Sequence, residues 1–388
     1  MALTFHWFLP TYGDSRYLVG GGHGTDITNT AGSDRPASLP YLRQIAVAAE
    51  NLGFLGVLTP TGAWCEDAWL TTAMLAGSTE RLKFLVAFRP GLLSPTLAAQ
   101  MAATFQRHAP DRLLINIVTG GEDAEQRAYG DFNTKDERYQ RTDEFLSVVR
   151  GLWRGERVTL AGQQVHVEGA KLARVPDPTP TLYFGGSSAA AVQVAAKHVD
   201  VYLTWGEPPS AVAEKIARLR AAAAEQGRTL RFGIRLHVIS RDTAEAAWAE
   251  ARRLVDALDP AVIADVQSGL LRSQSEGQQR MLALNRGTTD DLEIYPNLWA
   301  GVGLVRGGAG TALVGSHAEV AERIEEYHAL GIDEFILSGH PHLEEAYWFG
   351  EGVLPLLRRK GVWQHPARTE SVSAGIPFVD LTPTPTAS

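Results

Sequence analysis

Two cationic side chains alternate with apolar ones in residues 232–240. Successive side chains of a β-strand point to opposite faces, so Arg235 and His237 would share one face of a strand whose other face is apolar. Burying an unpaired charge is costly. The two groups therefore need a partner, and both an internal ion pair with a carboxylate and an anionic ligand are consistent with the pattern.

A further cationic candidate, Arg306, lies in the glycine-rich residues 299–310. Glycine leaves the backbone free to reorder, and long loops of this composition commonly carry function. This stretch closes the segment 261–315, which we predict to be a mobile lid that carries Arg306.

Glycines and serines at residues 185–188 separate a strand-like run from a helix-like run. Backbone N–H groups and hydroxyls at a helix N-terminus can hold a phosphate, although an ordinary capped helix start has the same composition. Asn116 and Thr119 end another apolar run. They are suited either to the edge of a heterocyclic ring or to capping a loop.

Strand-like and helix-like runs alternate through most of the chain. The strand-like runs are residues 4–9, 55–59, 82–88, 113–119, 182–185, 199–205, 232–240 and 332–338. Helix-like runs cover residues 39–52, 66–76, 95–107, 138–153, 188–197, 211–226 and 343–358. Eight strand-like runs in series, most of them followed by a helix-like run, predict an α/β fold, a single (β/α)8 barrel whose active site lies at the carboxyl ends of the strands.

Three segments interrupt this alternation, after strands 1, 4 and 7. They are a loop at 20–38, a hairpin-like stretch at 156–168 and the lid at about 261–315. We therefore predict one barrel domain over residues 1–360. Residues 361–388, rich in Pro, Thr and Ser, are predicted to be a disordered tail or an arm.

Composition narrows the classes of function. The 388 residues carry a net charge of −8, which argues against nucleic-acid binding. No apolar run approaches the roughly 20 residues that span a bilayer, and the first residues do not read as a signal peptide, so we expect a cytoplasmic protein. The single cysteine, Cys65, excludes an internal disulfide, and the histidines show no metal-binding spacing.

The chain up to about Arg358 resembles the bacterial luciferase-like flavin monooxygenases, in particular the FMNH2-dependent alkanesulfonate monooxygenases. The matching stretches are 8–11 (FLPT), 65–69 (CEDAW), 81–86 (RLKFLV), 183–188 (YFGGSS), 202–209 (YLTWGEPP), 231–238 (RFGIRLHV), 296–310 (PNLWAGVGLVRGGAG) and 341–345 (PHLEE). The resemblance implies a homodimer or homotetramer that receives FMNH2 from a separate NAD(P)H-dependent flavin reductase. With O2 as co-substrate, it would cleave the C–S bond of an organosulfonate to give sulfite and an aldehyde.

The strand ends and the resemblance together assign three sets of residues. The catalytic set is His237, Arg235, Arg306, Trp205 and His340. The substrate-binding set is Tyr12, Trp64, Cys65, Arg235 and Arg306. The FMN-binding set is Thr59, Asn116, Thr119, Tyr139, Gly185, Gly186, Ser187 and Ser188. In this assignment, which the resemblance implies, Arg235 and Arg306 bind either the sulfonate or the flavin peroxide, and His237 hydrogen-bonds where the flavin meets oxygen.

Three strand-end positions depart from the family pattern. Tyr12 stands where the family usually has His, Trp64 where it has Ser, and His340 where it has Tyr. We expect the chemistry to be retained and the substrate to differ, with a polar sulfonate such as sulfoquinovose favoured over a simple alkanesulfonate or methanesulfonate. A non-catalytic flavin-binding protein and a deazaflavin-dependent oxidoreductase are the remoter alternatives.

Overall fold

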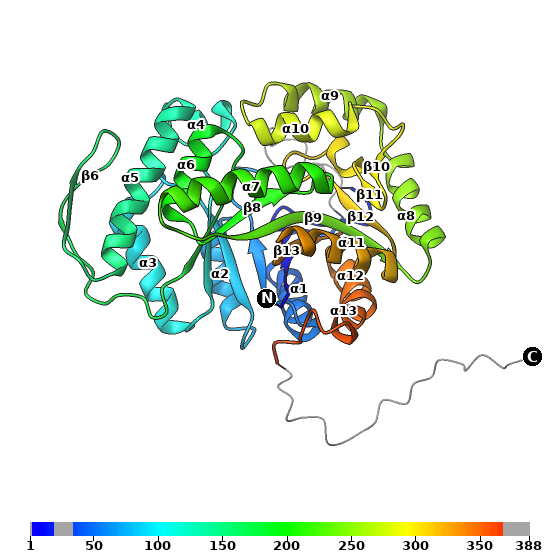
Figure 1. Ribbon diagram of the computed structural model, residues 1–388, viewed down its shortest axis with the longest axis horizontal. Coiled ribbons are helices and arrows are strands. Elements are labelled where there is room, and N and C mark those ends of the chain that lie inside the picture. Colours follow the sequence, from blue (N-terminus) through cyan, green and yellow to red (C-terminus); the bar gives the residue numbers. More distant parts are fainter. Residues whose placement is uncertain (1, 19–33, 368–388) are drawn as a thin grey trace, which may run out of the picture.

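Eight parallel strands close into a barrel in the computed structural model, which describes residues 2–18 and 34–367 (Figure 1). The strands are β1 (Thr4–Phe8), β2 (Gly56–Thr59), β3 (Lys83–Phe88), β4 (Leu113–Ile117), β7 (Thr181–Gly185), β8 (Val201–Trp205), β9 (Arg231–Arg241) and β13 (Glu334–Ser338). Strand β9 pairs with both β8 and β13, which closes the ring. The predicted (β/α)8 barrel is confirmed.

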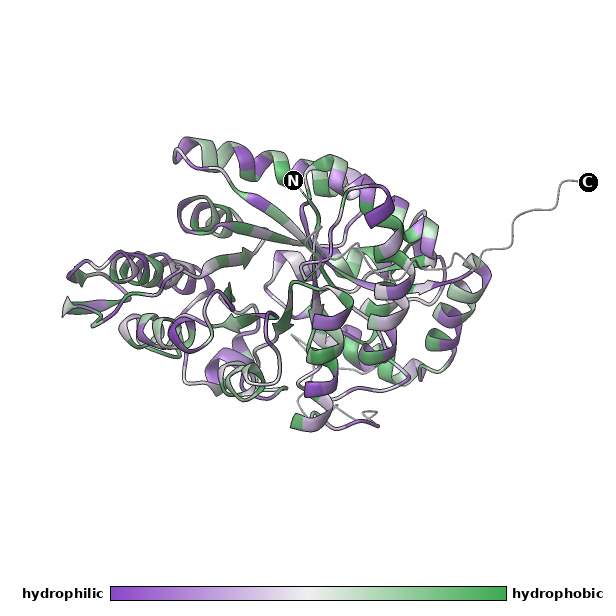
Figure 2. Ribbon diagram, turned by 90° about the horizontal axis from the view of Figure 1, so that it is seen from below, coloured by the Kyte–Doolittle hydropathy of each residue, from purple (hydrophilic) through white to green (hydrophobic). Residues whose placement is uncertain are grey.

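Helices surround the strands (Figure 2). Apolar side chains of the strands are buried against these helices. The helices are α1 (Leu39–Leu52), α2 (Ala68–Ala76), α3 (Pro95–His108), α5 (Lys135–Trp153), α6 (Ala189–His198), α7 (Pro209–Glu225), α11 (His317–Leu330), α12 (His342–Tyr347) and α13 (Leu354–Arg359), with a π-helical turn at Trp348–Val353. Side chains alternate as the sequence predicts: Ile234 and Leu236 of β9 pack in the outer core. Arg235 and His237 therefore face the barrel interior.

Strand β9 extends beyond the ring. Its first half pairs with β8, whereas residues 237–241 pair with β12 (Ala312–Ser316). Strands β11 (Leu298–Trp299) and β10 (Glu293–Tyr295) continue from β12 in antiparallel fashion. Because Ala312 lies opposite His237, the connection between β11 and β12, which contains Arg306, is fixed beside the inner face of β9.

The segment predicted as a lid is largely structured. It contains most of α9 (Pro260–Leu271), all of α10 (Glu276–Asn285), the three short strands above and a 3-10 turn at Gly301–Leu304, and α8 (Ala244–Asp256) precedes it. Helices α9 and α10 lie together over one end of the barrel (Figure 1). Residues 298–314 are buried. Movement of this segment stays a prediction.

The smaller predictions have mixed outcomes. The hairpin expected at 156–168 forms as β5 (Val158–Ala161) and β6 (His166–Ala170), followed along the chain by β7. A short helix, α4 (Asp123–Ala128), was not anticipated between β4 and α5. Most of the loop at 20–38 and of the tail at 361–388 lies outside the described residues.

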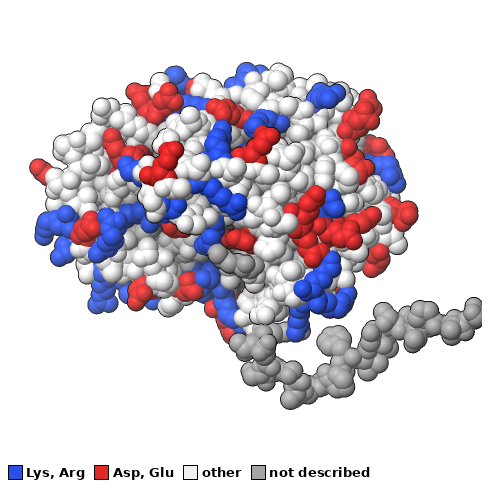
Figure 3. Space-filling view, viewed as in Figure 1, with Lys and Arg blue, Asp and Glu red and all other residues white. Residues whose placement is uncertain are grey.

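Charged side chains of both signs are interspersed over the face shown in Figure 3. Within residues 2–18 and 34–367, none of the helices combines the length and the apolar character that crossing a membrane would require.

Candidate active site

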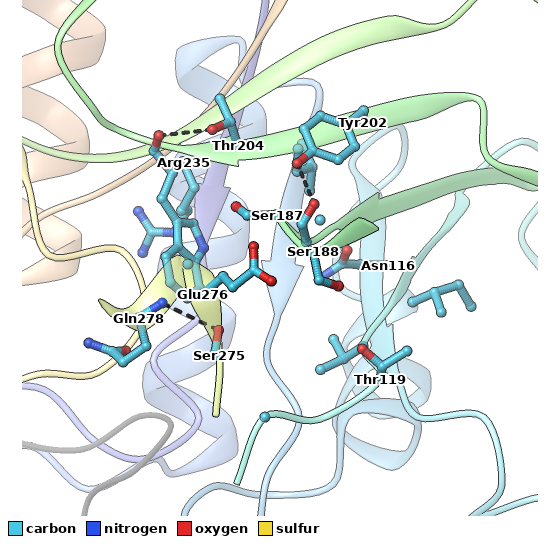
Figure 4. A pocket seen from close by; sticks show the side chains of 18 of the residues that line it. Asn116, Thr119, Ser187, Ser188, Tyr202, Thr204, Arg235, Ser275, Glu276 and Gln278 are labelled. Carbon is cyan, nitrogen blue, oxygen red and sulfur yellow. Dashed lines mark hydrogen bonds between the residues drawn. The ribbon is translucent and has the colours of Figure 1, made fainter. Parts of the chain in front are cut away.

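A pocket opens at the carboxyl ends of β4, β7 and β8, with about 1200 Å³ of empty volume including the part open to solvent. The predicted residues that line it are Asn116, Thr119, Tyr139, Gly185, Gly186, Ser187, Ser188, Trp205 and Arg235. In Figure 4, Asn116, Thr119, Ser187 and Ser188 lie on one side of this pocket and Arg235 on the other. The structure thus brings together most of the predicted FMN set.

The N-terminus of α6 forms one wall. Strand β7 ends at Gly185 and α6 begins at Ala189, with the Ser188 hydroxyl accepting a hydrogen bond from Ala191 N (3.2 Å). The carbonyl groups of Gly186 and Ser187 accept hydrogen bonds from Tyr202 Oη (2.6 Å) and a guanidinium of α7 (2.7 Å). In a trans peptide, N–H points opposite to C=O, so the next two N–H groups face away from these donors. They are available to a ligand at the helix N-terminus.

Glycine is required at residue 186 by the closeness of its neighbours. A Cβ added to Gly186 would lie 2.7 Å from Ala191 Cβ and 3.4 Å from Tyr139 Oη. These backbone N–H groups, the two serine hydroxyls and the Tyr139 phenol belong to residues that line the same pocket, and all of them can donate hydrogen bonds to a phosphate group. We call Tyr139, Gly186, Ser187 and Ser188 the phosphate cradle.

Residues of α10 form the opposite wall, which the sequence did not reveal. Ser275, Gly277 and Gln278 line the pocket, and the Glu276 carboxylate points into it (Figure 4). Helix α10 is anchored to the barrel by two hydrogen bonds from Arg280 to the buried Glu207 (2.6 and 2.7 Å). Gln278 also accepts a hydrogen bond from Gly308 N (2.9 Å), which connects this wall to the segment carrying Arg306.

A buried guanidinium group, Arg235, lines the pocket, and a second one, Arg306, packs on the same aromatic ring, Phe8. Arg235 lies 4.8 Å and Arg306 5.7 Å from the centre of the Phe8 ring, and their exposed fractions are 7% and 5%. In the part of the chain that the structure describes, neither makes an ion pair with a carboxylate. Burial, together with the charge of Arg306, lowers the pKa of Arg235 to about 9, so the group stays cationic at neutral pH. The internal ion pair considered from sequence is therefore not found among these residues, and an anionic ligand is favoured.

His237 holds Arg235 through Ser338. Arg235 Nη2 donates to Ser338 Oγ (2.8 Å), and this oxygen lies 2.8 Å from His237 Nδ1. His237 Nε2 lies 3.2 Å from the carbonyl oxygen of Ala309, which can only accept, so Nε2 carries the proton and Nδ1 accepts from Ser338. Burial, then the neighbouring Arg235, depresses the pKa of His237 well below its usual range. The ring is neutral and uses both nitrogens within the protein.

Aromatic rings pack around the Arg306 guanidinium. Its guanidinium lies 4.6 Å from the Tyr12 ring and 5.9 Å from the Trp64 ring, and it donates a hydrogen bond to the Tyr12 hydroxyl. Cys65 packs against the same aromatic group. Burial raises the pKa of its thiol to about 12, so it is protonated at neutral pH.

The remaining two predicted residues, His340 and Thr59, are both buried. His340 stacks on His237 with ring centres 5.4 Å apart. Thr59 is fully buried, and its hydroxyl lies 3.1 Å from that of Thr72. Thr59 does not line the pocket, so its contact with FMN stays a prediction. The group formed by Arg235, Arg306, His237 and His340 is called the cationic cluster below.

Residues 3–334 match the model of the luciferase-like monooxygenase family. The chain belongs to this family. Three solved structures show how widely its fold is shared. Riboflavin lyase RcaE, solved with modified FMN and riboflavin, has 22% identity and a TM-score of 0.77 over 94% of this chain and 93% of that one. DmoA from Hyphomicrobium sulfonivorans has 18% identity and a TM-score of 0.75 over 94% and 89%.

EDTA monooxygenase EmoA from Chelativorans sp. BNC1 has 20% identity and a TM-score of 0.73 over 94% of this chain and 95% of that one. At such identities these likenesses establish the fold, whereas substrates vary among luciferase-like proteins according to the residues at the strand ends. The substrate of this chain must therefore be argued from its own pocket.

Proposed function

We propose that this luciferase-like protein is an FMNH2-dependent monooxygenase that cleaves the C–S bond of an organosulfonate and releases sulfite and an aldehyde. The observation that carries the proposal is the buried pair Arg235 and Arg306, which has no carboxylate partner among the described residues, with Arg235 lining the same pocket as the phosphate cradle. The phosphate cradle suits a phosphorylated cofactor, and the arginine pair suits an anionic substrate.

The pocket residues divide into groups that would hold different parts of FMN. The phosphate cradle would bind the phosphate, Asn116 and Thr119 would hydrogen-bond a ring edge, and Trp205 would cover the ring. Reduced FMN, when bound, supplies the electrons with which O2 is activated for oxygen transfer.

The cationic cluster would hold the substrate. A sulfonate is anionic at any physiological pH, and a guanidinium group can donate two parallel hydrogen bonds to its oxygens. Ser338 orients one guanidinium and Tyr12 the other. The apolar side chains Leu203 and Ile336, which line the pocket beside Arg235, would limit access of water to the site.

Among sulfonates, we favour a sulfosugar such as sulfoquinovose. The Tyr12 and Trp64 rings lie 5.2 Å apart next to Arg306, and aromatic faces suit the apolar faces of sugar rings. Simple alkanesulfonates and methanesulfonate are the competing substrates. We further propose that a separate NAD(P)H-dependent reductase supplies FMNH2 and that the enzyme is a homo-oligomer.

A sulfite-release assay tests the proposal. The purified protein is given FMN, NADH, a flavin reductase and O2, together with sulfoquinovose, alkanesulfonates of increasing length, methanesulfonate or a polycarboxylate. We expect sulfite release to require FMN, reductase and O2, and kcat/KM to be highest for the sulfosugar. Absence of sulfite from every sulfonate, with oxygen consumption coupled instead to the polycarboxylate or to reduced deazaflavin, would contradict it.

A further inference from the structure

A buried carboxylate lies behind the cationic cluster. Asp14, with no exposed surface, accepts hydrogen bonds from Ser15 N (2.9 Å), His342 N (2.7 Å) and the Tyr41 hydroxyl (2.5 Å). Its Oδ1 also lies 2.9 Å from Nδ1 of the His342 ring. Burial raises the pKa of Asp14, but His342 and the hydrogen bonds outweigh this effect and lower it to about 2. Asp14 is thus ionised at neutral pH.

This contact fixes the tautomer of a neutral His342. An ionised carboxylate can only accept, so the proton lies on Nδ1 and Nε2 bears a lone pair. The Nε2 atom is buried, and in residues 2–18 and 34–367 it has no hydrogen-bond partner. A buried acceptor without a hydrogen-bond partner destabilises the protein. This indicates that a bound ligand supplies the missing donor.

The His342 ring lies close to the cationic cluster. The His342 ring centre lies 5.7 Å from that of Phe8, the ring on which Arg235 and Arg306 also pack. It lies 5.1 Å from the ring of His340. The two guanidinium groups offer donors only, whereas His342 Nε2 offers an acceptor in the same region. An anion with no hydrogen-bond donor would satisfy the arginines and leave this nitrogen unpaired.

We propose that His342, oriented by Asp14, accepts a hydrogen bond from a hydroxyl group of the substrate close to its anionic group. His342 is then a specificity residue, and Asp14 is the positioning residue behind it. This inference rests on the proposed function, because it takes the anion held by the two arginines to be a sulfonate. It selects hydroxylated sulfonates over plain alkanesulfonates.

Two probes that differ by one hydroxyl group test this inference by calorimetry, without turnover: 2-hydroxyethanesulfonate and ethanesulfonate. The wild-type protein should bind the hydroxylated probe more tightly. In His342→Asn, the amide N–H can still donate to Asp14 while the Nε2 acceptor is lost. Affinity for the hydroxylated probe should fall about tenfold, and affinity for ethanesulfonate should stay within about twofold. The control is His166→Asn, on the exposed hairpin.

Nitrogen-15 NMR of the wild-type imidazoles provides a measurement that needs no variant. His342 should carry its proton on Nδ1, and the Nε2 resonance should shift with the hydroxylated probe only. In Asp14→Asn, whose amide can also donate to Nδ1, the share of this tautomer and the preference for the hydroxylated probe should both fall.

The outcomes distinguish the inference from the function on which it rests. Equal binding of the two probes to the wild-type protein, or a protonated Nε2, would overturn the role of His342 alone. Failure of both probes to bind, at concentrations where the arginine pair should hold a sulfonate, would overturn the proposed function and this inference together.

Discussion

The phosphate cradle shares one pocket with Arg235 of the cationic cluster, but the cradle and the cluster are built by different means. The cradle is assembled from backbone groups at the start of α6, so neighbouring residues of the chain supply nearly all of it. The cluster is assembled from side chains of β9, of the β11–β12 connection and of the segment that follows β13, which are far apart in sequence.

This difference predicts how each part responds to substitution. Most side-chain substitutions leave the backbone N–H groups in place as long as the backbone conformation is unchanged. The cradle should therefore be sensitive to substitution mainly where an added Cβ would clash with a neighbour. Each cation of the cluster depends on its own side chain and on the side chains that orient it. Substitutions in the cradle should therefore lower FMN affinity, and substitutions in the cluster should lower kcat/KM for the sulfonate.

The largest effect is expected from Arg306→Ala. The variant loses charge-assisted contacts of about 1.5–3 kcal/mol, so kcat/KM for the sulfonate should fall about ten- to a hundredfold. The melting temperature should stay within a few degrees of the wild-type value, because the substitution also removes the repulsion between the positive charges of Arg306 and Arg235. Arg306→Lys should restore little of the lost kcat/KM, since an ammonium group cannot donate the two parallel, coplanar hydrogen bonds of a guanidinium.

The matched control is Arg272→Ala, which removes an exposed guanidinium from the end of α9. A large fall in melting temperature for Arg306→Ala, with activity per folded molecule unchanged, would show that Arg306 belongs to the scaffold.

Gly186→Ala should weaken the cradle alone. The added Cβ, 2.7 Å from Ala191 Cβ, must displace α6 or the loop before it. We expect FMN affinity, measured by fluorescence titration, to fall about tenfold, which corresponds to one lost charge-assisted hydrogen bond. Gly77→Ala is the control, because a Cβ there meets nothing within 4 Å. Unchanged FMN affinity in Gly186→Ala would place the phosphate elsewhere.

Ser338→Ala should affect the cluster without removing a charge. It leaves Arg235 Nη2 and His237 Nδ1 without their shared partner. At about 1 kcal/mol for such a bond, kcat/KM should fall about fivefold, and FMN affinity should not change. The control Ser147→Ala removes a hydroxyl that bonds a helix carbonyl outside the pocket. An equal loss in both variants would mean that the Ser338 bridge does not orient Arg235.

The smallest effect is expected from Cys65→Ser. The thiol is protonated and donates weakly to the carbonyl oxygens of Pro60 and Gly62, at 3.7 and 3.5 Å, and a hydroxyl can do the same. Sulfite release should stay within about twofold. Loss of activity with FMN binding intact would show that the thiol takes part in the reaction.

The features that were predicted correctly from the sequence are those that depend on short, local residue patterns. The alternation of residues 232–240 placed Arg235 and His237 on the inner face of β9, and β9 differs from the predicted strand by one residue at each end. The glycine and serine pattern at residues 185–188 marked the start of α6 in the same way. Both features depend on neighbouring residues.

Long-range contacts explain what the sequence did not predict. Strand β12 has only five residues after a glycine-rich stretch, and its pairing with β9 defines it. The wall formed by α10 depends on the bonds from Arg280 to Glu207, 73 residues away in sequence. Asp14 and His342 each lie two positions from a predicted residue, but they are 328 positions apart, and only the folded chain brings them together.

A crystal structure with FMN and a sulfonate ligand tests the central claim most directly. We predict that sulfonate oxygens lie within hydrogen-bonding distance of both the Arg235 and the Arg306 guanidinium groups, and that the FMN phosphate lies against residues 186–188. A sulfonate bound away from both arginines, or an FMN phosphate held by the arginine pair, would contradict the account.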